Sequence, residues 1–185
     1  GRFYCGLTLE AAIKYRLKAG MHVEKSLLDE IQFETDKNTA LDKALTHISA
    51  SMKTERQIRD FLDKKGYTAA VCDYVVERMQ YYGFLDDYAY CKAYISGVSG
   101  RGKRLIEADL IKRGASRAAI ERALSEAEED DDGAKQLAAK YLRGKERTKE
   151  NLYKAVKYLV SRGYGYDSAR RAVDVSEDGD EDYPS

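Results

Sequence analysis

The residues best suited to catalysis or metal binding are few in this chain and far apart. His22 and His47 lie in separate segments, and neither has a serine, cysteine or aspartate placed beside it as a catalytic partner. The cysteines Cys5, Cys72 and Cys91 form no CxxC pair, so they predict no metal site and are typical of a protein in a reducing cytoplasm. The carboxylates are spread along the chain without the paired spacing that acid–base chemistry needs. We therefore expect a protein that is not an enzyme and needs no cofactor.

Basic residues are the more informative group, because they cluster although the chain as a whole is neutral. Between Lys135 and Arg162, nine basic residues face only two acids, Glu146 and Glu150. Such a cluster can follow phosphates or meet an acidic protein surface. It can equally be a solvated face that only keeps the protein soluble. The candidate contacts, which include basic residues near two other turns, are Arg101, Lys103, Arg104, Lys112, Arg113, Lys140, Arg143, Lys145, Arg147, Lys149, Lys154, Lys157 and Arg162.

Three similar turns must position these residues. Each has a basic helix end, a glycine, one small or aromatic residue, and then a small residue suited to start another helix: Asp63–Thr68, Ile111–Ser116 and Val160–Gly165. The glycines are 48 and 49 residues apart, and a leucine lies four residues before each of them. A period of this length predicts repeated supersecondary units. Basic residues suit a helix C-terminus, and a glycine just beyond it can adopt the left-handed conformation that closes the helix.

The apolar residues between the turns recur at helical spacing, and Thr54 with Gln57 has the spacing of a capping box. We expect an N-terminal segment with a short strand at 3–7 and helices, in which a helix from about Glu24 either breaks at 36–38 or continues. The expected parts are this segment (1–37), three three-helix repeats (38–83, 84–129 and 130–173) and an acidic, disordered tail (174–185). The chain has no signal peptide and no apolar run near the roughly 18 residues of a membrane helix, so we expect a cytoplasmic protein that does not bind membranes.

One stretch resembles a known family. Gly83-Phe84-Leu85-Asp86-Asp87, followed by Tyr90, Cys91 and Tyr94, is similar to the G-Y-L-D-D…F-A…Y signature of RecX regulatory proteins. The resemblance extends from Leu17–Met21, through Gly102, Ile106, Leu110 and Lys112-Arg113-Gly114, to Arg162–Asp167. The departures are Tyr90 and Cys91 in place of Phe and Ala, Gln57 in place of Glu, and Gly165 in place of a Ser cap.

The resemblance implies an all-α fold of tandem three-helix repeats, each similar to a helix-turn-helix unit, in an elongated curved array. It also implies a monomeric regulator that binds the RecA recombinase filament on DNA. Such a regulator restrains ATP hydrolysis, strand exchange and co-protease activity. The single- or double-stranded DNA would be contacted weakly or within the filament. The resemblance favours a binding role for the basic candidates over a purely solubilising one.

Two other functions remain open from the sequence. The first is a helix-turn-helix protein that acts directly on DNA, whose third helices would offer Glu77, Arg78 and Gln80, then Arg117, Glu121 and Arg122, and then Arg170 and Arg171. The second is a pure protein adaptor. We expect the glycine-rich stretch Ser96–Arg104 to be a flexible basic turn and not a phosphate loop. Five tyrosines are expected to pack between repeats and not to stack on bases: Tyr81, Tyr82, Tyr88, Tyr153 and Tyr158.

Overall fold

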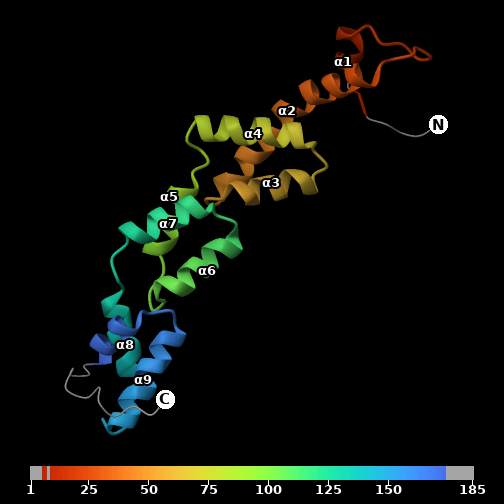
Figure 1. The fold of residues 1–185 in the computed structure, drawn as a ribbon. Helices are drawn as coiled ribbons and strands as arrows, with labels where there is room; N and C mark the ends of the chain where they lie inside the picture. Colours follow the sequence, from red (N-terminus) through yellow and green to blue (C-terminus); the bar gives the residue numbers. More distant parts are fainter. Residues whose placement is uncertain (1–5, 8, 174–185) are drawn as a thin grey trace. The chain divides into compact units, whose positions relative to one another are not determined.

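The structure is a computed structural model that describes residues 6–7 and 9–173, and within these residues the chain forms ten α-helices and no strand (Figure 1). The all-α prediction is confirmed. Most of the expected strand at 3–7 and the whole acidic tail lie outside the described residues. The helices are α1 Leu9–Lys14, α2 Lys25–Ser49, α3 Glu55–Lys64, α4 Ala69–Tyr81, α5 Asp87–Ser96, α6 Lys103–Arg113, α7 Arg117–Glu126, α8 Asp131–Leu142, α9 Lys149–Ser161 and α10 Tyr166–Val173.

The chain divides into two compact units, Gly1–Asp87 and Tyr88–Ser185. In the first unit, α2, α3 and α4 share one hydrophobic core. Helix α2 is continuous through residues 36–38, so the expected boundary between residues 37 and 38 lies inside this helix. Thr54 caps α3 in the predicted capping box with Gln57, and Thr68 caps α4 through the backbone N–H of Val71.

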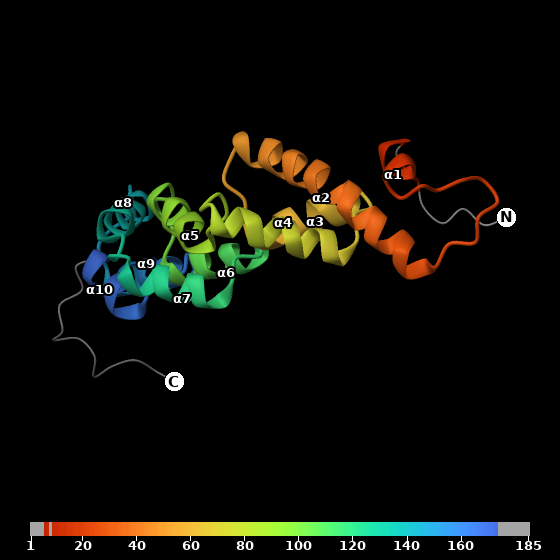
Figure 2. The same cartoon turned by 90° about the horizontal axis from the view of Figure 1, so that it is seen from above.

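The second unit contains two further hydrophobic cores. One is enclosed by α5, α6 and α7, and the other by α8, α9 and α10. Helix α10, labelled in Figure 2, packs on both α8 and α9. The main buried side chains of these two cores are Tyr90, Cys91, Ile106, Leu110, Ile120 and Ala123 in the first, and Ala134, Ala138, Val156, Leu159, Tyr164 and Val173 in the second.

The three glycine turns have the same atomic structure. Gly66, Gly114 and Gly163 all adopt left-handed φ angles, between +82° and +89°, so the predicted helix ends are confirmed. In each turn, the residue after the glycine donates its backbone N–H to the carbonyl of the leucine four residues before the glycine. These bonds are Tyr67 to Leu62 at 3.3 Å, Ala115 to Leu110 at 3.1 Å and Tyr164 to Leu159 at 3.2 Å. All three leucines are fully buried, which explains why the leucine recurs with the glycine.

None of the helices that the structure describes is both long and apolar enough to cross a bilayer. The described residues also contain no group of three His, Cys, Asp or Glu side chains that is able to hold a metal ion.

Candidate functional site

The start of α6 packs directly against the turn between α9 and α10. Gly102 donates its N–H to the carbonyl of Arg162 at 3.0 Å, and Arg104 donates its N–H to the carbonyl of Gly163 at 3.2 Å. A Cβ on Gly102 would lie 2.0 Å from the carbonyl carbon of Gly163, so a side chain at position 102 requires the two backbones to separate. The end of the stretch Ser96–Arg104 is therefore anchored to the third repeat, a contact that the expectation of a flexible turn did not include.

Asp130, the N-cap of α8, adds a second anchor to this joint. One of its carboxylate oxygens accepts from the N–H of Gly133 at 2.9 Å, and the other accepts from the N–H of Gly100 at 2.8 Å and the hydroxyl of Tyr164 at 3.0 Å. Tyr164 is only 1% exposed. Its burial, together with the bond to Asp130, raises the pKa of Tyr164 well above its ordinary value, so the phenol stays protonated as the donor.

Two basic residues of the anchored turn support the fold. The guanidinium of Arg101, just before α6, pairs with the carboxylate of Asp109 in the middle of that helix. The ammonium of Lys103 donates to the carbonyl of Ala127 at 2.7 Å and lies 3.5 Å from the carboxylate of Glu129. Both cations are therefore already engaged within the second unit.

The end of α6 presents one free and one restrained cation. Lys112 is exposed and its side chain contacts no charged or aromatic partner among the described residues. Arg113 donates to the hydroxyl of Tyr90 at 3.3 Å, and its guanidinium lies 4.7 Å from the ring centre of Tyr94. The bond to the Tyr90 hydroxyl raises the pKa of Arg113, so this cation stays charged.

An aromatic pair holds two basic residues of the third repeat. The rings of Tyr141 on α8 and Tyr158 on α9 are stacked, with their centroids 4.9 Å apart and their planes inclined by 22°. Lys145 lies over the first ring, with its ammonium 3.5 Å from the centroid, and the Arg162 guanidinium lies 5.2 Å from the centroid of the second. An aromatic pair contributes about 0.5–1.5 kcal/mol and an exposed cation–π contact about 0.5–1 kcal/mol. This four-residue stack therefore limits the motion of both cations.

Arg147 has a structural role. Its guanidinium donates to the backbone carbonyl of Val173 at 2.9 Å, at the last residue of α10. The last carbonyls of a helix have no partner within the helix and carry partial negative charge, which a cation stabilises. We infer that Arg147 fixes the end of α10.

The basic residues of α9 differ in how far they are engaged. Lys154 forms an ion pair with Glu150 one turn earlier, at 2.6 Å, and this contact raises the pKa of Lys154. Lys157 lies over the ring of Tyr153, at 4.4 Å. Lys149, at the start of the helix, is exposed and makes no side-chain contact of this kind with any described residue.

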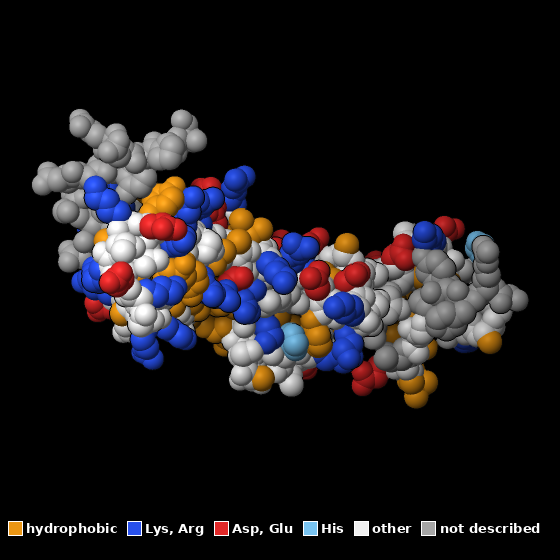
Figure 3. All heavy atoms as spheres, turned by 90° about the horizontal axis from the view of Figure 1, so that it is seen from below, with side chains coloured by type: hydrophobic (Ala, Val, Ile, Leu, Met, Phe, Trp, Pro, Cys, Tyr) orange, Lys and Arg blue, Asp and Glu red, His pale blue; other side chains and the backbone are white. Residues whose placement is uncertain are grey.

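Lys140 and Arg143 are the remaining candidates on the third repeat. Both are exposed, and neither side chain has an ion-pair or hydrogen-bond partner in the part of the chain that the structure describes. They also line one surface groove, together with Leu137 and Gly100. On the face shown in Figure 3, many Lys and Arg side chains (blue) are exposed at the surface. The exposed basic residues without an acidic partner form a set that we call the third-repeat cations: Lys140, Arg143, Lys145, Lys149, Lys157 and Arg162.

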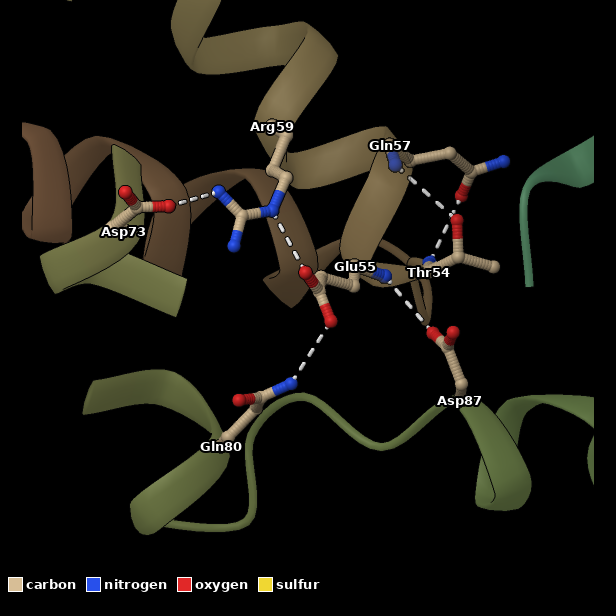
Figure 4. A network of polar contacts seen from close by, with 7 residues as sticks. All are labelled: Thr54, Glu55, Gln57, Arg59, Asp73, Gln80 and Asp87. Atoms are coloured by element: carbon tan, nitrogen blue, oxygen red, sulfur yellow. Dashed lines mark hydrogen bonds and ion pairs between the residues drawn. The ribbon is translucent and has the colours of Figure 1, made fainter. Parts of the chain in front are cut away.

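A polar network in the first unit links residues of the fold to one another (Figure 4). Asp87, at the start of α5, accepts the N–H of Glu55, the first residue of α3, at 2.9 Å. Asp130 has a similar role between the second and third repeats. It is the N-cap of α8, the first helix of the third repeat, and it accepts the N–H of Gly100 in the loop before α6, the second helix of the second repeat. Arg59 joins α3 to α4 through Glu55 at 2.7 Å and Asp73 at 2.6 Å. These residues hold the repeat together and offer no free charge.

The third helix of each repeat gives little support to sequence-specific DNA reading. In the first two repeats its arginines are engaged along their own helix: Arg78 with Tyr82 at 2.8 Å, Arg117 with Glu121 at 3.3 Å and Arg122 with Glu126 at 3.1 Å. In the third repeat, Arg171 donates to Ser168 of its own helix at 3.1 Å and lies 3.9 Å from the carboxylate of Asp131. A reading helix must instead direct such side chains at base edges.

The tyrosines do not behave as one group. Tyr88 and Tyr158 contact residues of their own repeats, whereas Tyr81 and Tyr82 are 79% and 53% exposed. Tyr164 helps to join two repeats, because the Asp130 oxygen that accepts from its hydroxyl also accepts the N–H of Gly100 in the second repeat. In the sequence, the only indication that Tyr164 has a structural role is its position directly after the glycine of a turn.

Comparisons with known proteins relate this architecture to one family. A family model of the first three-helix domain of RecX matches residues 40–79. The chain is 30% identical to the regulatory protein RecX of Leuconostoc mesenteroides, over 97% of this chain and 71% of that protein. It is also 30% identical to the regulatory protein RecX of Clostridium botulinum, over 84% of this chain and 79% of that protein. The chain belongs to the RecX family.

Solved RecX structures share the fold. The crystal structure of RecX from Lactobacillus salivarius superposes with a TM-score of 0.71 at 18% identity, over 76% of this chain and 96% of that one. A second crystal structure of regulatory protein RecX gives the same TM-score at 20% identity, over 91% and 87% of the two chains. At these identities the likeness concerns the fold alone.

Several of the residues that resemble the RecX signature are structural in this chain. Asp87 holds the start of α3, Gly102 permits the joint with the third repeat, and Gly114 and Gly163 close helices. The signature therefore identifies the fold more directly than it identifies the binding residues.

Proposed function

We propose that this chain is a non-enzymatic regulator that binds the RecA recombinase filament on DNA and restrains its ATP hydrolysis, strand exchange and co-protease activity. It acts as a monomer in the cytoplasm. Membership of a family whose relatives are named regulatory proteins supports this proposal. The observation that carries it is the set of third-repeat cations, which are exposed and face no acidic partner among the described residues.

The electrostatic character of these residues fits an anionic polymer. Each phosphate contact made by a lysine or arginine contributes through counterion release, and the contribution falls as salt rises. The stack around Tyr141 and Tyr158 limits the freedom of Lys145 and Arg162 before binding. Less side-chain entropy is then lost when they contact the partner.

We divide the thirteen predicted contact residues into two groups. In our proposal, the third-repeat cations contact the filament together with Arg104 and Lys112. The other five serve the fold, because each already has a hydrogen-bond or ion-pair partner: Arg101, Lys103, Arg113, Arg147 and Lys154.

Charge reversal of three unengaged cations tests the proposal. The variant Lys140→Glu/Arg143→Glu/Lys149→Glu changes the net charge by six without removing a described contact. Its matched control, Lys18→Glu/Arg56→Glu/Lys64→Glu, changes the charge equally at exposed positions of the first unit. Binding to RecA filaments assembled on fluorescent single-stranded DNA is measured by co-sedimentation, with circular dichroism as the folding check.

We expect the third-repeat variant to lose at least about tenfold in affinity and to bind with a smaller salt dependence, because three contacts are lost. The control is expected to lose much less. Equal affinities for the third-repeat variant and the unmodified protein, with helicity unchanged in both, would reject this site.

A further inference from the structure

The acidic segment after α10 starts beside the basic residues of the third repeat. Residues 174–185 contain six acids and no basic residue. The preceding residue, Val173, is buried, and its carbonyl is held by the guanidinium of Arg147 at 2.9 Å. The segment therefore leaves the fold from a fixed point next to the loop between α8 and α9.

The charges of the two regions are complementary. The stretch from Lys135 to Arg162 has nine basic residues and two acids, an excess of seven positive charges. One of the two acids, Glu150, is already paired with Lys154. Lys140, Arg143 and Lys149 have no acidic partner among the described residues. The neighbouring segment carries six negative charges, close to the number needed to neutralise this excess.

The reach of the segment is sufficient. Twelve residues span at most about 40 Å when extended and about 20 Å on average as a flexible coil. Helices α8 and α9, of 12 and 13 residues, are each about 20 Å long. Every third-repeat cation therefore lies within reach of a chain tethered at Val173, and such a short tether gives an effective concentration of about 1 mM or more.

We propose that residues 174–185 bind the third-repeat cations within the same molecule and compete there with the phosphates of nucleic acid. The competition rests on the proposed function, whereas the intramolecular contact does not. The segment weakens the binding of any polyanion at low salt, and it ceases to do so when salt screens the contact. A partner with enough negative charge displaces the segment, so a dense phosphate array is favoured over an isolated acidic patch.

A spin label tests the contact directly. The variant Ser185→Cys, combined with Cys5→Ser, carries the label; Cys72 and Cys91 are buried and remain unchanged. Backbone amide signals of residues 140–162 are recorded at 25 mM and 500 mM salt. The same measurement is made on a tail-neutral variant, Asp174→Asn/Glu177→Gln/Asp178→Asn/Asp180→Asn/Glu181→Gln/Asp182→Asn. In the control variant, the residues of 174–185 are in scrambled order, so the segment keeps its acids but loses its sequence.

We expect broadening of the 140–162 amides at low salt in the labelled protein and in the scrambled control. We expect recovery at high salt and in the tail-neutral variant. Broadening that is absent at low salt, or that persists after neutralisation, overturns the proposal.

Binding of a fluorescent oligothymidine then tests the competition. If the segment occupies the site in about nine of ten molecules, neutralising it raises affinity about tenfold at low salt, and this gain disappears at 500 mM salt. The control Glu10→Gln/Asp60→Asn/Glu77→Gln removes exposed acids from the first unit and is expected to have a smaller effect. If the 140–162 amides broaden but the tail-neutral variant gains no more affinity than this control, the proposed competition is wrong. A failure of filament binding with the spin-label result intact would reject the proposed function alone.

Discussion

Replacement of Gly102 by alanine tests the joint between the second and third repeats. The local backbone conformation predicts that alanine makes the fold more stable, whereas the tertiary contact predicts that it makes the fold less stable. Gly102 has φ −73° and ψ 160°, which alanine adopts without strain. On backbone grounds alone, Gly102→Ala would stabilise the fold by about 0.4–1 kcal/mol through the unfolded state. The new Cβ would, however, lie 2.0 Å from the carbonyl carbon and 2.2 Å from the carbonyl oxygen of Gly163.

The tertiary cost is larger than the local gain. Overpacking costs about 1–3 kcal/mol, and weakening the bonds from Gly102 to Arg162 and from Arg104 to Gly163 costs about 1 kcal/mol for each bond lost. We expect the free energy of unfolding to fall by about 2–4 kcal/mol after the local gain is subtracted.

Urea unfolding followed by circular dichroism measures this change. With an m value of about 2 kcal/mol/M, the transition that reports the second unit moves to lower urea by about 1–2 M. The matched control is Gly165→Ala, where a Cβ meets nothing within 4 Å and where we expect a loss of about 1 kcal/mol or less from the poorer helix cap. An unchanged or raised midpoint for Gly102→Ala would refute the close backbone contact.

Four further predictions use the same joint and the third repeat. Arg147→Ala should destabilise the fold by about 1–2 kcal/mol because the carbonyl of Val173 loses a charged donor, whereas Lys149→Ala should change stability by less than about 0.5 kcal/mol; thermal melting compares them. Folding raises the pKa of Tyr164, so the stability that its protonated hydroxyl contributes is complete below the ordinary pKa of 10 and is lost as pH rises above it. In urea titrations, Tyr164→Phe should therefore lose less stability at alkaline pH than the unmodified protein does, and it should be about 1 kcal/mol less stable at neutral pH. Gly165→Ser should stabilise α10 by a few tenths of a kcal/mol, measured by melting, because serine is the better N-cap. Tyr158→Leu should weaken filament binding several-fold in a pull-down while Tyr158→Phe does not, since only the ring is needed for the stack with Tyr141 and Arg162.

The repeating turns were predictable because they depend on local chemistry. Gly66 adopts a positive φ, and the carbonyl of Leu62 accepts the N–H of Tyr67, the residue after this glycine. The glycine and the leucine lie within five residues of each other, so they recur together in the sequence. The capping box of Thr54 and Gln57 is equally local. Such features are encoded by spacing alone.

The joint and the roles of the cations were not predictable in this way. The contact of Gly102 with Gly163 and the bond of Arg147 to Val173 link positions that are 61 and 26 residues apart in the printed sequence. Nothing in the spacing indicates that Lys103 is engaged by the carbonyl of Ala127 while Lys140 has no described partner. Composition therefore identified a cluster of basic residues, and only the packing separates those that hold the fold from those available for binding.

The most direct test of the account is ATP hydrolysis by RecA on single-stranded DNA, with this protein added below the recombinase concentration. We predict that hydrolysis falls at a small molar ratio of this protein to RecA, and that the Lys140→Glu/Arg143→Glu/Lys149→Glu variant leaves it high. Hydrolysis that is unaffected by the unmodified protein even at an equal concentration would contradict the proposed function.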